Sequence, residues 1–310
     1  MRIALDFAGS ETSPEVFIEA ISLVVKRRPY LRFLLLVPRG YPLSIPAELA
    51  FCVEICFAHD VVAMEDSPLL AIRDKRQSTL FVALTALKNS DVQACISTGN
   101  TGALVAGAQL LLPLFKGVKR LALLANIPLA EKPLTLIDAG ASLCGRVSHL
   151  VQFALLGTTY QKLRFGVTEP KVGLLNIGQE AEKGPAELQK AYQALSGMHD
   201  QKKMLFYGNV EANQVFDGRV QVLVTPGFSG NLFLKTAEGA WEFLRSRLAL
   251  PYFLDACPSP VGSGLLMGTR SLLFKCHGRS SAEAICHAME EACFLSEQRM
   301  VEKMQEACWK

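Results

Sequence analysis

Short apolar runs alternate with stretches of helical periodicity along almost the whole chain. Apolar runs bounded by polar turns predict buried strands, and apolar residues repeated at the spacing of a helical turn predict helices. The predicted strands cover 2–6, 31–37, 51–57, 61–63, 92–96, 121–126, 135–138, 171–177, 205–207, 220–224 and 271–276. The predicted helices cover 14–26, 78–88, 149–157, 187–195, 232–250 and 282 to the end of the chain, with Ser13, Ser78 and Ser280 as N-caps. This alternation predicts an α/β fold in which helices cover both faces of a mostly parallel sheet.

The composition adds few constraints. The chain has 310 residues, 50% of them hydrophobic, which suits one large domain or two lobes. Its net charge is +3 and it has no basic stripe interleaved with aromatic residues, so no nucleic acid partner is expected. The nine cysteines include no C-x-x-C pair, and Asp6 interrupts the N-terminal apolar run, so we expect free thiols, no metal and a cytoplasmic protein. The longest apolar stretch, 103–115, is too short to span a membrane.

A polar loop joins the predicted strand 92–96 to an Ala/Leu-rich helical run. Its residues are Ser97, Thr98, Gly99, Asn100, Thr101 and Gly102. The first N–H groups of a helix are unpaired and carry the positive end of its dipole, and the two glycines let a ligand approach the backbone. Since hydroxyl and amide donors surround these groups and no acid does, the loop predicts a phosphate site. The alternative is an ordinary strand-to-helix turn with a good N-cap.

A second polar cluster follows the predicted strand 220–224. We expect Gly227, Gly230 and Asn231 to form a tight turn, with Lys235 in the first turns of the next helix. A cation is disfavoured at a helix start, so Lys235 is expected to meet an anion there.

Other strand ends carry further candidates. Asp138 could orient a substrate or cap a turn, and Lys183 could meet an anion or be an ordinary solvated lysine. Asn209 and Glu211 follow the predicted strand 205–207. Ligands of open α/β sheets bind at the carboxyl ends of the strands. Neither a P-loop nor a dinucleotide fingerprint is present, so no cofactor is expected.

Several motifs in combination resemble one family. They are Ser-Thr-Gly-Asn-Thr-Gly-Ala-Leu at 97–104, His-Leu-Val-Gln-Phe-Ala at 149–154, Val-Gly-Leu-Leu-Asn-Ile-Gly at 172–178, Gly-Asn-Val-Glu at 208–211, Gly-Phe-Ser-Gly-Asn at 227–231, Leu-Lys-Thr at 234–236 and His-Gly at 277–278. The chain thus resembles the PlsX-type phosphate acyltransferases of bacterial phospholipid synthesis over essentially all of 1–310. The resemblance implies a single acyltransferase domain like isopropylmalate dehydrogenase and phosphotransacetylase, an α/β/α sandwich with two lobes around a cleft, and a homodimer.

The resemblance also implies an activity. Family members transfer the acyl group of acyl-[acyl carrier protein] to inorganic phosphate, giving acyl phosphate. Because phosphate is already ionised and a thiolate leaves readily, such an enzyme mainly has to position phosphate and stabilise an oxyanion. The expected catalytic groups are Lys235, Asn231 and Asn100. The expected binding groups are Ser97, Thr98, Gly99, Thr101, Gly102, Asp138, Lys183, Asn209, Glu211 and Gly230.

The chain departs from the family pattern in places. The family's Gly-Gly-Asp-His-Ala-Pro is replaced at 8–14 by a segment without the Asp-His pair. Its Asp-Val-Gly-Ala-Asn is replaced by Asp-Ala-Gly-Ala-Ser at 138–142, and its acid before Gly227 by Pro226. We expect that those groups are not essential; the alternative is a member that diverges in rate or specificity. For the function itself, the alternatives are a phosphotransacetylase-like enzyme using acyl-coenzyme A and a non-catalytic, membrane-associated scaffold.

The segment after Lys235 bears on membrane contact. Trp241, Leu244 and Leu248 fall at helical spacing, and 250–254 ends the segment early. The corresponding region of the family is longer and is implicated in peripheral membrane contact. A core or dimer interface is the alternative for this apolar stripe.

Overall fold

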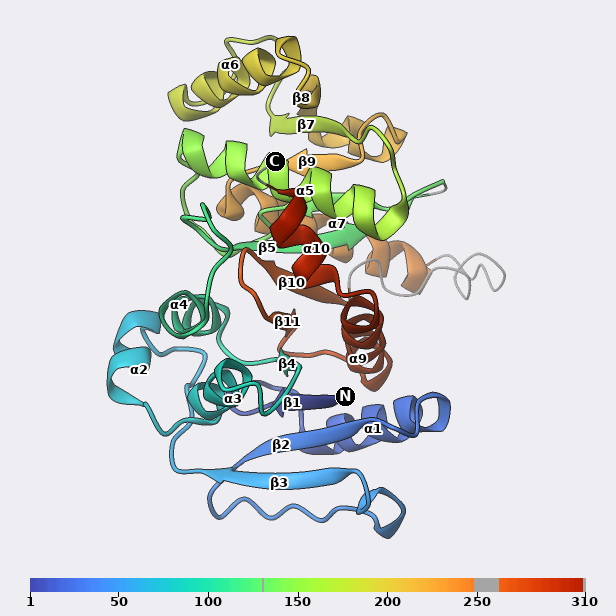
Figure 1. The fold of residues 1–310 in the computed structure, drawn as a ribbon. Helices are drawn as coiled ribbons and strands as arrows, with labels where there is room; N and C mark the ends of the chain where they lie inside the picture. Colours follow the sequence, from blue (N-terminus) through green and yellow to red (C-terminus); the bar gives the residue numbers. More distant parts are fainter. Residues whose placement is uncertain (130, 248–261, 309–310) are drawn as a thin grey trace. The chain divides into compact units, whose positions relative to one another are not determined.

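The computed structural model describes residues 1–129, 131–247 and 262–308. The chain divides into two compact units (Figure 1), which are described separately. Unit 1 comprises Met1–Lys116 and Thr269–Val301, and unit 2 comprises Gly117–Gly268 and Glu302–Lys310. Both units combine strands with flanking helices, and most strand pairs are parallel, which confirms the predicted fold class.

Unit 1 is built on parallel strands. In spatial order these are β3 (Val53–Ala58), β2 (Arg32–Pro38), β1 (Arg2–Asp6), β4 (Ala94–Ser97) and β11 (Leu272–Cys276). Its helices are α1 (Pro14–Arg27), α2 (Pro68–Asp74), α3 (Thr79–Lys88), α4 (Thr101–Leu111) and α9 (Ala282–Glu297), with a short 3-10 helix, η1 (Ala47–Leu49). α1 packs against α9, and α2 and α3 pack against α4. Because the five strands are parallel, their carboxyl ends all lie on the same edge of the sheet.

Unit 2 has a mixed sheet. In spatial order its strands are β10 (Ser263–Met267), β5 (Ala122–Ile127), β6 (Leu134–Ile137), β9 (Val222–Val224), β7 (Lys171–Asn176) and β8 (Leu205–Glu211). β5 is antiparallel to β10 and β6, and the strands from β6 to β8 are parallel. Its helices are α5 (Val147–Phe165), α6 (Ala186–Asp200), α7 (Gly227–Arg247) and the 3-10 helix η2 (Ala212–Asp217), and α10 (Met300–Ala307) crosses the division in sequence.

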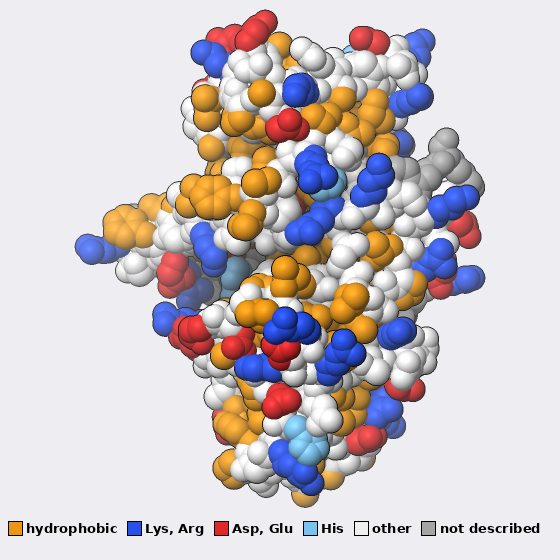
Figure 2. Space-filling model, turned by 90° about the vertical axis from the view of Figure 1, so that its left-hand side faces the viewer, with side chains coloured by type: hydrophobic (Ala, Val, Ile, Leu, Met, Phe, Trp, Pro, Cys, Tyr) orange, Lys and Arg blue, Asp and Glu red, His pale blue; other side chains and the backbone are white. Residues whose placement is uncertain are grey.

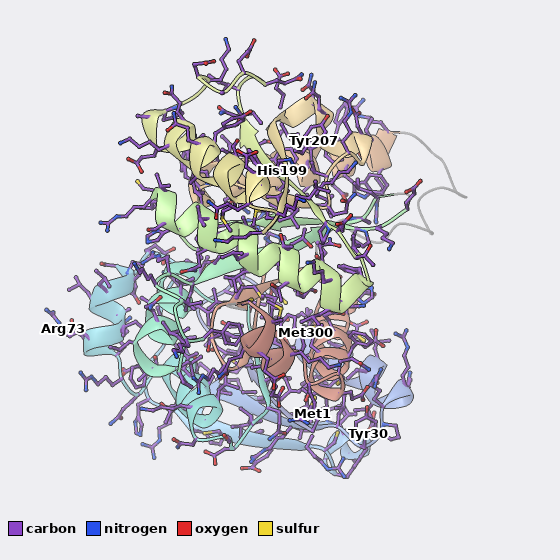
Figure 3. All side chains as sticks on the ribbon, turned by 45° about the horizontal axis from the view of Figure 1, so that its top comes forward. Met1, Tyr30, Arg73, His199, Tyr207 and Met300 are labelled. Carbon is purple, nitrogen blue, oxygen red and sulfur yellow. The ribbon has the colours of Figure 1, made fainter. Side chains whose placement is uncertain are left out.

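Local packing in unit 2 follows from alternation along its strands. In β8, Phe206 is buried whereas its neighbour Tyr207 is exposed, as successive side chains of a strand point to opposite faces. The Phe206 N–H donates to Nδ1 of His199, which links β8 to the end of α6. Figure 3 labels His199 of α6 and Tyr207 of β8. On the face shown in Figure 2, lysine and arginine side chains are interspersed with acidic and apolar ones.

Several predicted elements need correction. Residues 61–63 form no strand, and the sequence did not predict α2 or β10. α2 escapes a periodicity test because Leu69 and Leu70 are exposed, so the helix shows no clear apolar face. The last helix breaks after Glu297, and its N-cap is Ser281 rather than Ser280.

The start of α7 also differs from the prediction. Gly227 and Gly230 lie in its first turn rather than in a tight turn before it, and Lys235 lies beyond its first two turns. The prediction that Lys235 opposes the dipole at a helix start is therefore wrong. The glycines serve close packing instead: a Cβ on Gly230 would lie 2.0 Å from the backbone oxygen of Asp138, and one on Gly227 would lie 2.3 Å from that of Ser142.

Candidate active site

Buried polar side chains lie in a row at the carboxyl edge of unit 1. Asp6 of β1 and Lys275 of β11 both pair with Ser97 of β4, which lies between them. All three are buried. The Ser97 hydroxyl donates to Oδ2 of Asp6 at 2.7 Å, and Nζ of Lys275 donates to the carbonyl of Thr98 at 3.1 Å. The row therefore holds the first residues of the predicted phosphate loop.

Asp6 and Lys275 were not predicted as site residues. Burial raises the pKa of the Asp6 carboxyl, while the Ser97 hydroxyl and the charge of Lys275 act in the opposite direction. The signal in the sequence is the presence of a charged residue in each of two otherwise apolar strand runs, 3–6 and 272–276. Charged residues are rarely fully buried unless they are paired, so a charged residue in an apolar strand run is a candidate site residue.

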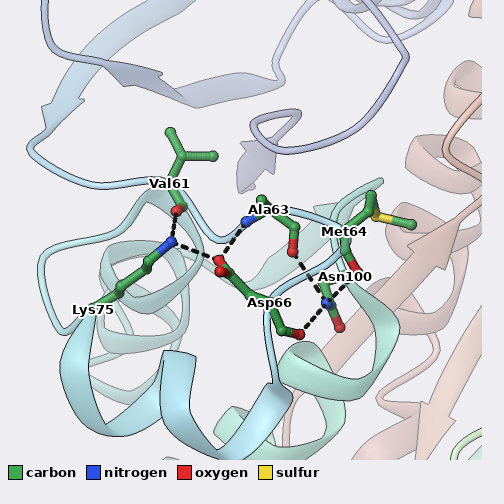
Figure 4. Close-up of polar contacts among 6 residues, drawn as sticks. All are labelled: Val61, Ala63, Met64, Asp66, Lys75 and Asn100. Carbon is green, nitrogen blue, oxygen red and sulfur yellow. Dashed lines mark hydrogen bonds and ion pairs between the residues drawn. The ribbon is translucent and has the colours of Figure 1, made fainter.

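The Asn100 side chain is fully used within unit 1 (Figure 4). Its amide nitrogen donates to the carbonyls of Ala63, Met64 and Asp66 at 3.1, 3.1 and 3.2 Å. Its oxygen accepts the N–H of Ala103 at 3.0 Å, so Asn100 is the N-cap of α4. These contacts tie the segment after β3 to the start of α4.

The loop hydroxyls are also engaged. The Thr98 and Ser10 hydroxyl oxygens lie 2.9 Å apart, and the Gly99 N–H donates to the Ser97 hydroxyl at 3.1 Å. Among the described residues, the N–H groups of Thr101 and Gly102 have no partner. The donors that remain for an anion are therefore the backbone groups at the start of α4 and the Thr101 hydroxyl, which has no partner among the described residues.

In unit 2, the Asp138 carboxylate organises the loop after β6. Its Oδ1 accepts the N–H groups of Leu123, Gly140 and Ala141 at 2.9, 3.0 and 2.8 Å. Its Oδ2 accepts the Ser142 hydroxyl at 2.7 Å. Burial raises the pKa of Asp138, and these donors oppose that shift. The geometry favours the loop-ordering interpretation of Asp138.

The start of α7 interlocks with this loop. The Gly227 N–H donates to the Ser142 hydroxyl at 3.3 Å. A Cβ on Gly140, whose φ is +137°, would lie 2.6 Å from Nδ2 of Asn231, so the amide sits directly on the loop. Asn231 and Lys235 are four residues apart and share one helix face. Within the described part of the chain, neither side chain has a hydrogen bond or an ion pair.

A third loop lies beside these in unit 2. The carbonyls of Lys183 and Glu180 accept the Asn176 and Asn209 amides at 3.0 and 2.8 Å, which fixes the loop between β7 and α6. The Lys183 ammonium lies 3.9 Å from Oε2 of Glu180. Gln179 donates to Glu211 at 3.3 Å. An open pocket of about 620 Å³ is lined by Ile177, Gly178, Gln179, Glu180, Lys183 and Glu211.

The predicted site residues divide between the two units. Those in unit 1 are Ser97, Thr98, Gly99, Asn100, Thr101 and Gly102. Those in unit 2 are Asp138, Lys183, Asn209, Glu211, Gly230, Asn231 and Lys235. Because β6, β9, β7 and β8 are parallel neighbours, the unit 2 residues gather at one edge of its sheet.

Other predicted features concern metals and membranes. In the ranges 1–129, 131–247 and 262–308, no three His, Cys, Asp or Glu side chains are grouped to hold a metal ion. No helix within the same ranges has the length and apolar character needed to cross a bilayer. The 250–254 segment and Leu248, which bear on membrane contact, lie outside the described residues.

Comparisons with known proteins agree with this architecture. The family described as "Fatty acid synthesis protein" matches residues 1–250. The chain is 33% identical to a phosphate acyltransferase of Clostridium acetobutylicum, over 98% of each protein. It is 32% identical to one from Staphylococcus aureus, over 99% of the chain and 98% of that protein. Its fold is similar to a crystal structure of a phosphotransacetylase from Streptococcus pyogenes, with a TM-score of 0.65 and 13% identity over 100% of the chain and 94% of that structure. By this full-length similarity, the chain belongs to the fatty acid synthesis protein family, the PlsX-type phosphate acyltransferases, which are acyltransferase enzymes.

Proposed function

We propose that this protein transfers a fatty acyl group from the thioester of acyl carrier protein to inorganic phosphate, releasing acyl phosphate. The observation that carries the proposal is the pair Asn231 and Lys235, an amide and an ammonium on one face of α7, the helix that begins at the carboxyl edge of the unit 2 sheet. Their described surroundings leave both groups uncommitted, so they are available to a substrate. The names of the relatives support the same reaction.

The chemistry needs few proton transfers. A phosphate oxygen attacks the thioester carbonyl carbon, and the new O–C bond leaves a tetrahedral oxyanion. Collapse of the oxyanion breaks the C–S bond, and the thiolate of the carrier leaves with the electron pair. Fixed donors aimed at the developing negative charge lower the barrier to this reaction. The Asn231 amide and the Lys235 ammonium supply such donors, whether the charge is on phosphate or on the oxyanion.

The other unit 2 residues position this pair. Asp138 holds the loop on which Asn231 sits, and Gly230 allows α7 to lie against that loop. Asn209 holds the loop that carries Lys183, and Lys183 and Glu211 line the open pocket. We assign orientation of the substrate to these two charged groups.

The loop of unit 1 is assigned to phosphate binding through its backbone. Thr101 and Gly102 supply free N–H groups, with the dipole of α4 behind them. Ser97, Thr98 and Asn100 shape the loop through the hydrogen bonds they already make. Gly99 allows the loop to lie close to the segment after β1, since a Cβ there would lie 3.2 Å from the backbone oxygen of Ala8.

The reaction is tested with purified protein and defined substrates. Acyl carrier protein and coenzyme A, each carrying the same acyl chain, are supplied with phosphate, and acyl phosphate is trapped with hydroxylamine. Phosphate-dependent product from the carrier protein supports the proposal. Product from coenzyme A alone favours the phosphotransacetylase-like alternative, and no product from either donor favours the scaffold.

The assignment of Asn231 and Lys235 has its own test. Asn231→Ala or Lys235→Ala should lower kcat about 100-fold or more, as loss of an oxyanion donor does in other enzymes. Lys190→Ala is the control, because this lysine is also exposed and, among the described residues, pairs with Glu187 of its own helix. Folded variants with unchanged turnover would overturn the assignment.

A homodimer, a cytoplasmic location and peripheral membrane contact remain further proposals that rest on family resemblance. Light scattering of the purified chain tests the first of these. Co-sedimentation with liposomes tests membrane contact, and a folded dimer that stays in the supernatant would count against it.

A further inference from the structure

Large apolar side chains are exposed after each parallel strand at the carboxyl edge of unit 2. Leu143 follows β6 and Ile177 follows β7, each with 80% of its surface exposed. Phe228 and Leu232 follow β9 on α7, and Phe216 follows β8. The other exposed large apolar side chains described in unit 2 are Leu163, Tyr207, Phe243 and Leu244. Exposed apolar side chains that gather at one edge indicate a binding surface.

η2 and α7 bring part of this surface together. The rings of Phe216 in η2 and Phe233 in α7 are stacked, with centroids 6.0 Å apart. Phe216, the exposed residue after β8, therefore lies beside the helix that carries Phe228 and Leu232. Ile177 also lines the open pocket that contains Lys183.

The apolar residues of α7 adjoin its uncommitted polar pair. Asn231 follows Phe228 by three residues, and Lys235 follows Leu232 by three. Residues three and four apart are neighbours on a helix surface, so an apolar stripe runs directly beside a polar stripe. This arrangement fits a ligand that has a negatively charged reacting end and an apolar tail.

We propose that the acyl chain of the thioester and of the acyl phosphate lies on the surface formed by Phe228, Leu232 and Ile177. This inference rests on the proposed function, because the chain is covalently attached to the carbonyl carbon that would react at Asn231 and Lys235. Each methylene removed from water is worth about fourfold in an equilibrium constant. These side chains therefore determine the preference for long acyl chains over short ones.

The test compares two acyl carrier protein donors, one with a butanoyl and one with a hexadecanoyl chain. For the double variant Phe228→Ala and Leu232→Ala, kcat/KM should fall about tenfold or more with the long chain. With the short chain it should stay within about twofold of the unmodified protein, because a short chain reaches little of the surface. Ile177→Ala should give a smaller loss in the same sense.

The matched control is the double variant Phe243→Ala and Leu244→Ala. These residues lie on the same helix and are exposed, but they are far along α7 from Asn231. This variant should keep both rates. Melting curves establish that all variants are folded.

Each contrary result has a distinct meaning. An equal loss with both donors, or no loss with either, would overturn the proposal while leaving acyl transfer itself supported. A changed molar mass in light scattering with the long-chain rate retained would assign the surface to a second copy of the chain, and would also overturn it. No acyl phosphate from the unmodified protein with any donor would refute the proposed function and this inference together.

Discussion

The close contact between Gly230 and the loop after β6 predicts that Gly230→Ala destabilises the protein. In a Gly230→Ala variant the new Cβ would lie 2.0 Å from the backbone oxygen of Asp138 and 2.7 Å from Cγ2 of Thr225. The obstructing oxygen belongs to the backbone and cannot rotate away as a side chain would. α7 must therefore move by about 1 Å to relieve the overlap. Overpacking of this kind costs about 1–3 kcal/mol of stability.

The net effect combines this cost with helix propensity. Alanine is favoured over glycine in a helix interior by about 1 kcal/mol. Since the clash is with backbone, we expect the upper end of the overpacking range and a net destabilisation of about 2 kcal/mol. For a unit of this size, that corresponds to a melting temperature about 4–8 °C lower. Displacement of Asn231 should also cost about 100-fold in acyl phosphate formation.

Gly239→Ala provides the control. Gly239 lies in the same helix, and a Cβ there would have no neighbour within 4 Å among the described residues. This substitution should raise stability by about 0.5–1 kcal/mol and leave activity unchanged. Thermal melts and the hydroxylamine assay measure both effects. If Gly230→Ala behaved like Gly239→Ala, the account of how α7 is positioned would be wrong.

Substitutions at Asn100, Asp138 and His149 test the local interactions of these three side chains. Asn100→Ala removes the N-cap of α4 and should lower the free energy of unfolding by about 1 kcal/mol. It also removes the hydrogen bonds to residues 63–66, so limited proteolysis should cleave this segment faster. Asp138→Asn should lower the free energy of unfolding, measured by urea denaturation at neutral pH, by about 2–3 kcal/mol, because it disrupts a carboxylate that accepts four hydrogen bonds. Burial, with nearby cations, lowers the pKa of His149 from 6.5, so the unfolded chain binds more protons below that pH and stability should fall as the pH drops through it. His149→Gln should remove part of this loss of stability at low pH. An unchanged pH dependence would contradict the role of His149.

Much of the architecture was predictable because buried parallel strands appear as apolar runs. β1, β7 and β11 coincide closely with predicted strands, and polar clusters after them mark the edge where ligands bind. The predicted cap of α3 at Ser78 is confirmed, since its hydroxyl accepts the Phe81 N–H at 3.3 Å. Such local patterns depend only on neighbours in sequence, which is why the sequence reveals them.

The rest depends on contacts between segments far apart in sequence. Glycines in the first turn of α7 look like turn residues until the loop of Asp138 is placed against them. Asn100 looks like a ligand-binding amide, and only the position of residues 63–66 shows that its donors are used. Lys275 stands in an apolar strand without local explanation until Thr98 is seen beside it.

The most direct test of the account follows oxygen atoms from phosphate into product. Purified protein is supplied with acyl carrier protein bearing a fatty acyl chain and with 18O-labelled phosphate, and the product is examined by mass spectrometry. We predict acyl phosphate that retains the label, and its loss in the Asn231→Ala, Lys235→Ala double variant but not in Lys190→Ala. Absence of labelled acyl phosphate from the unmodified protein, or its undiminished formation by the folded double variant, would contradict the central claim.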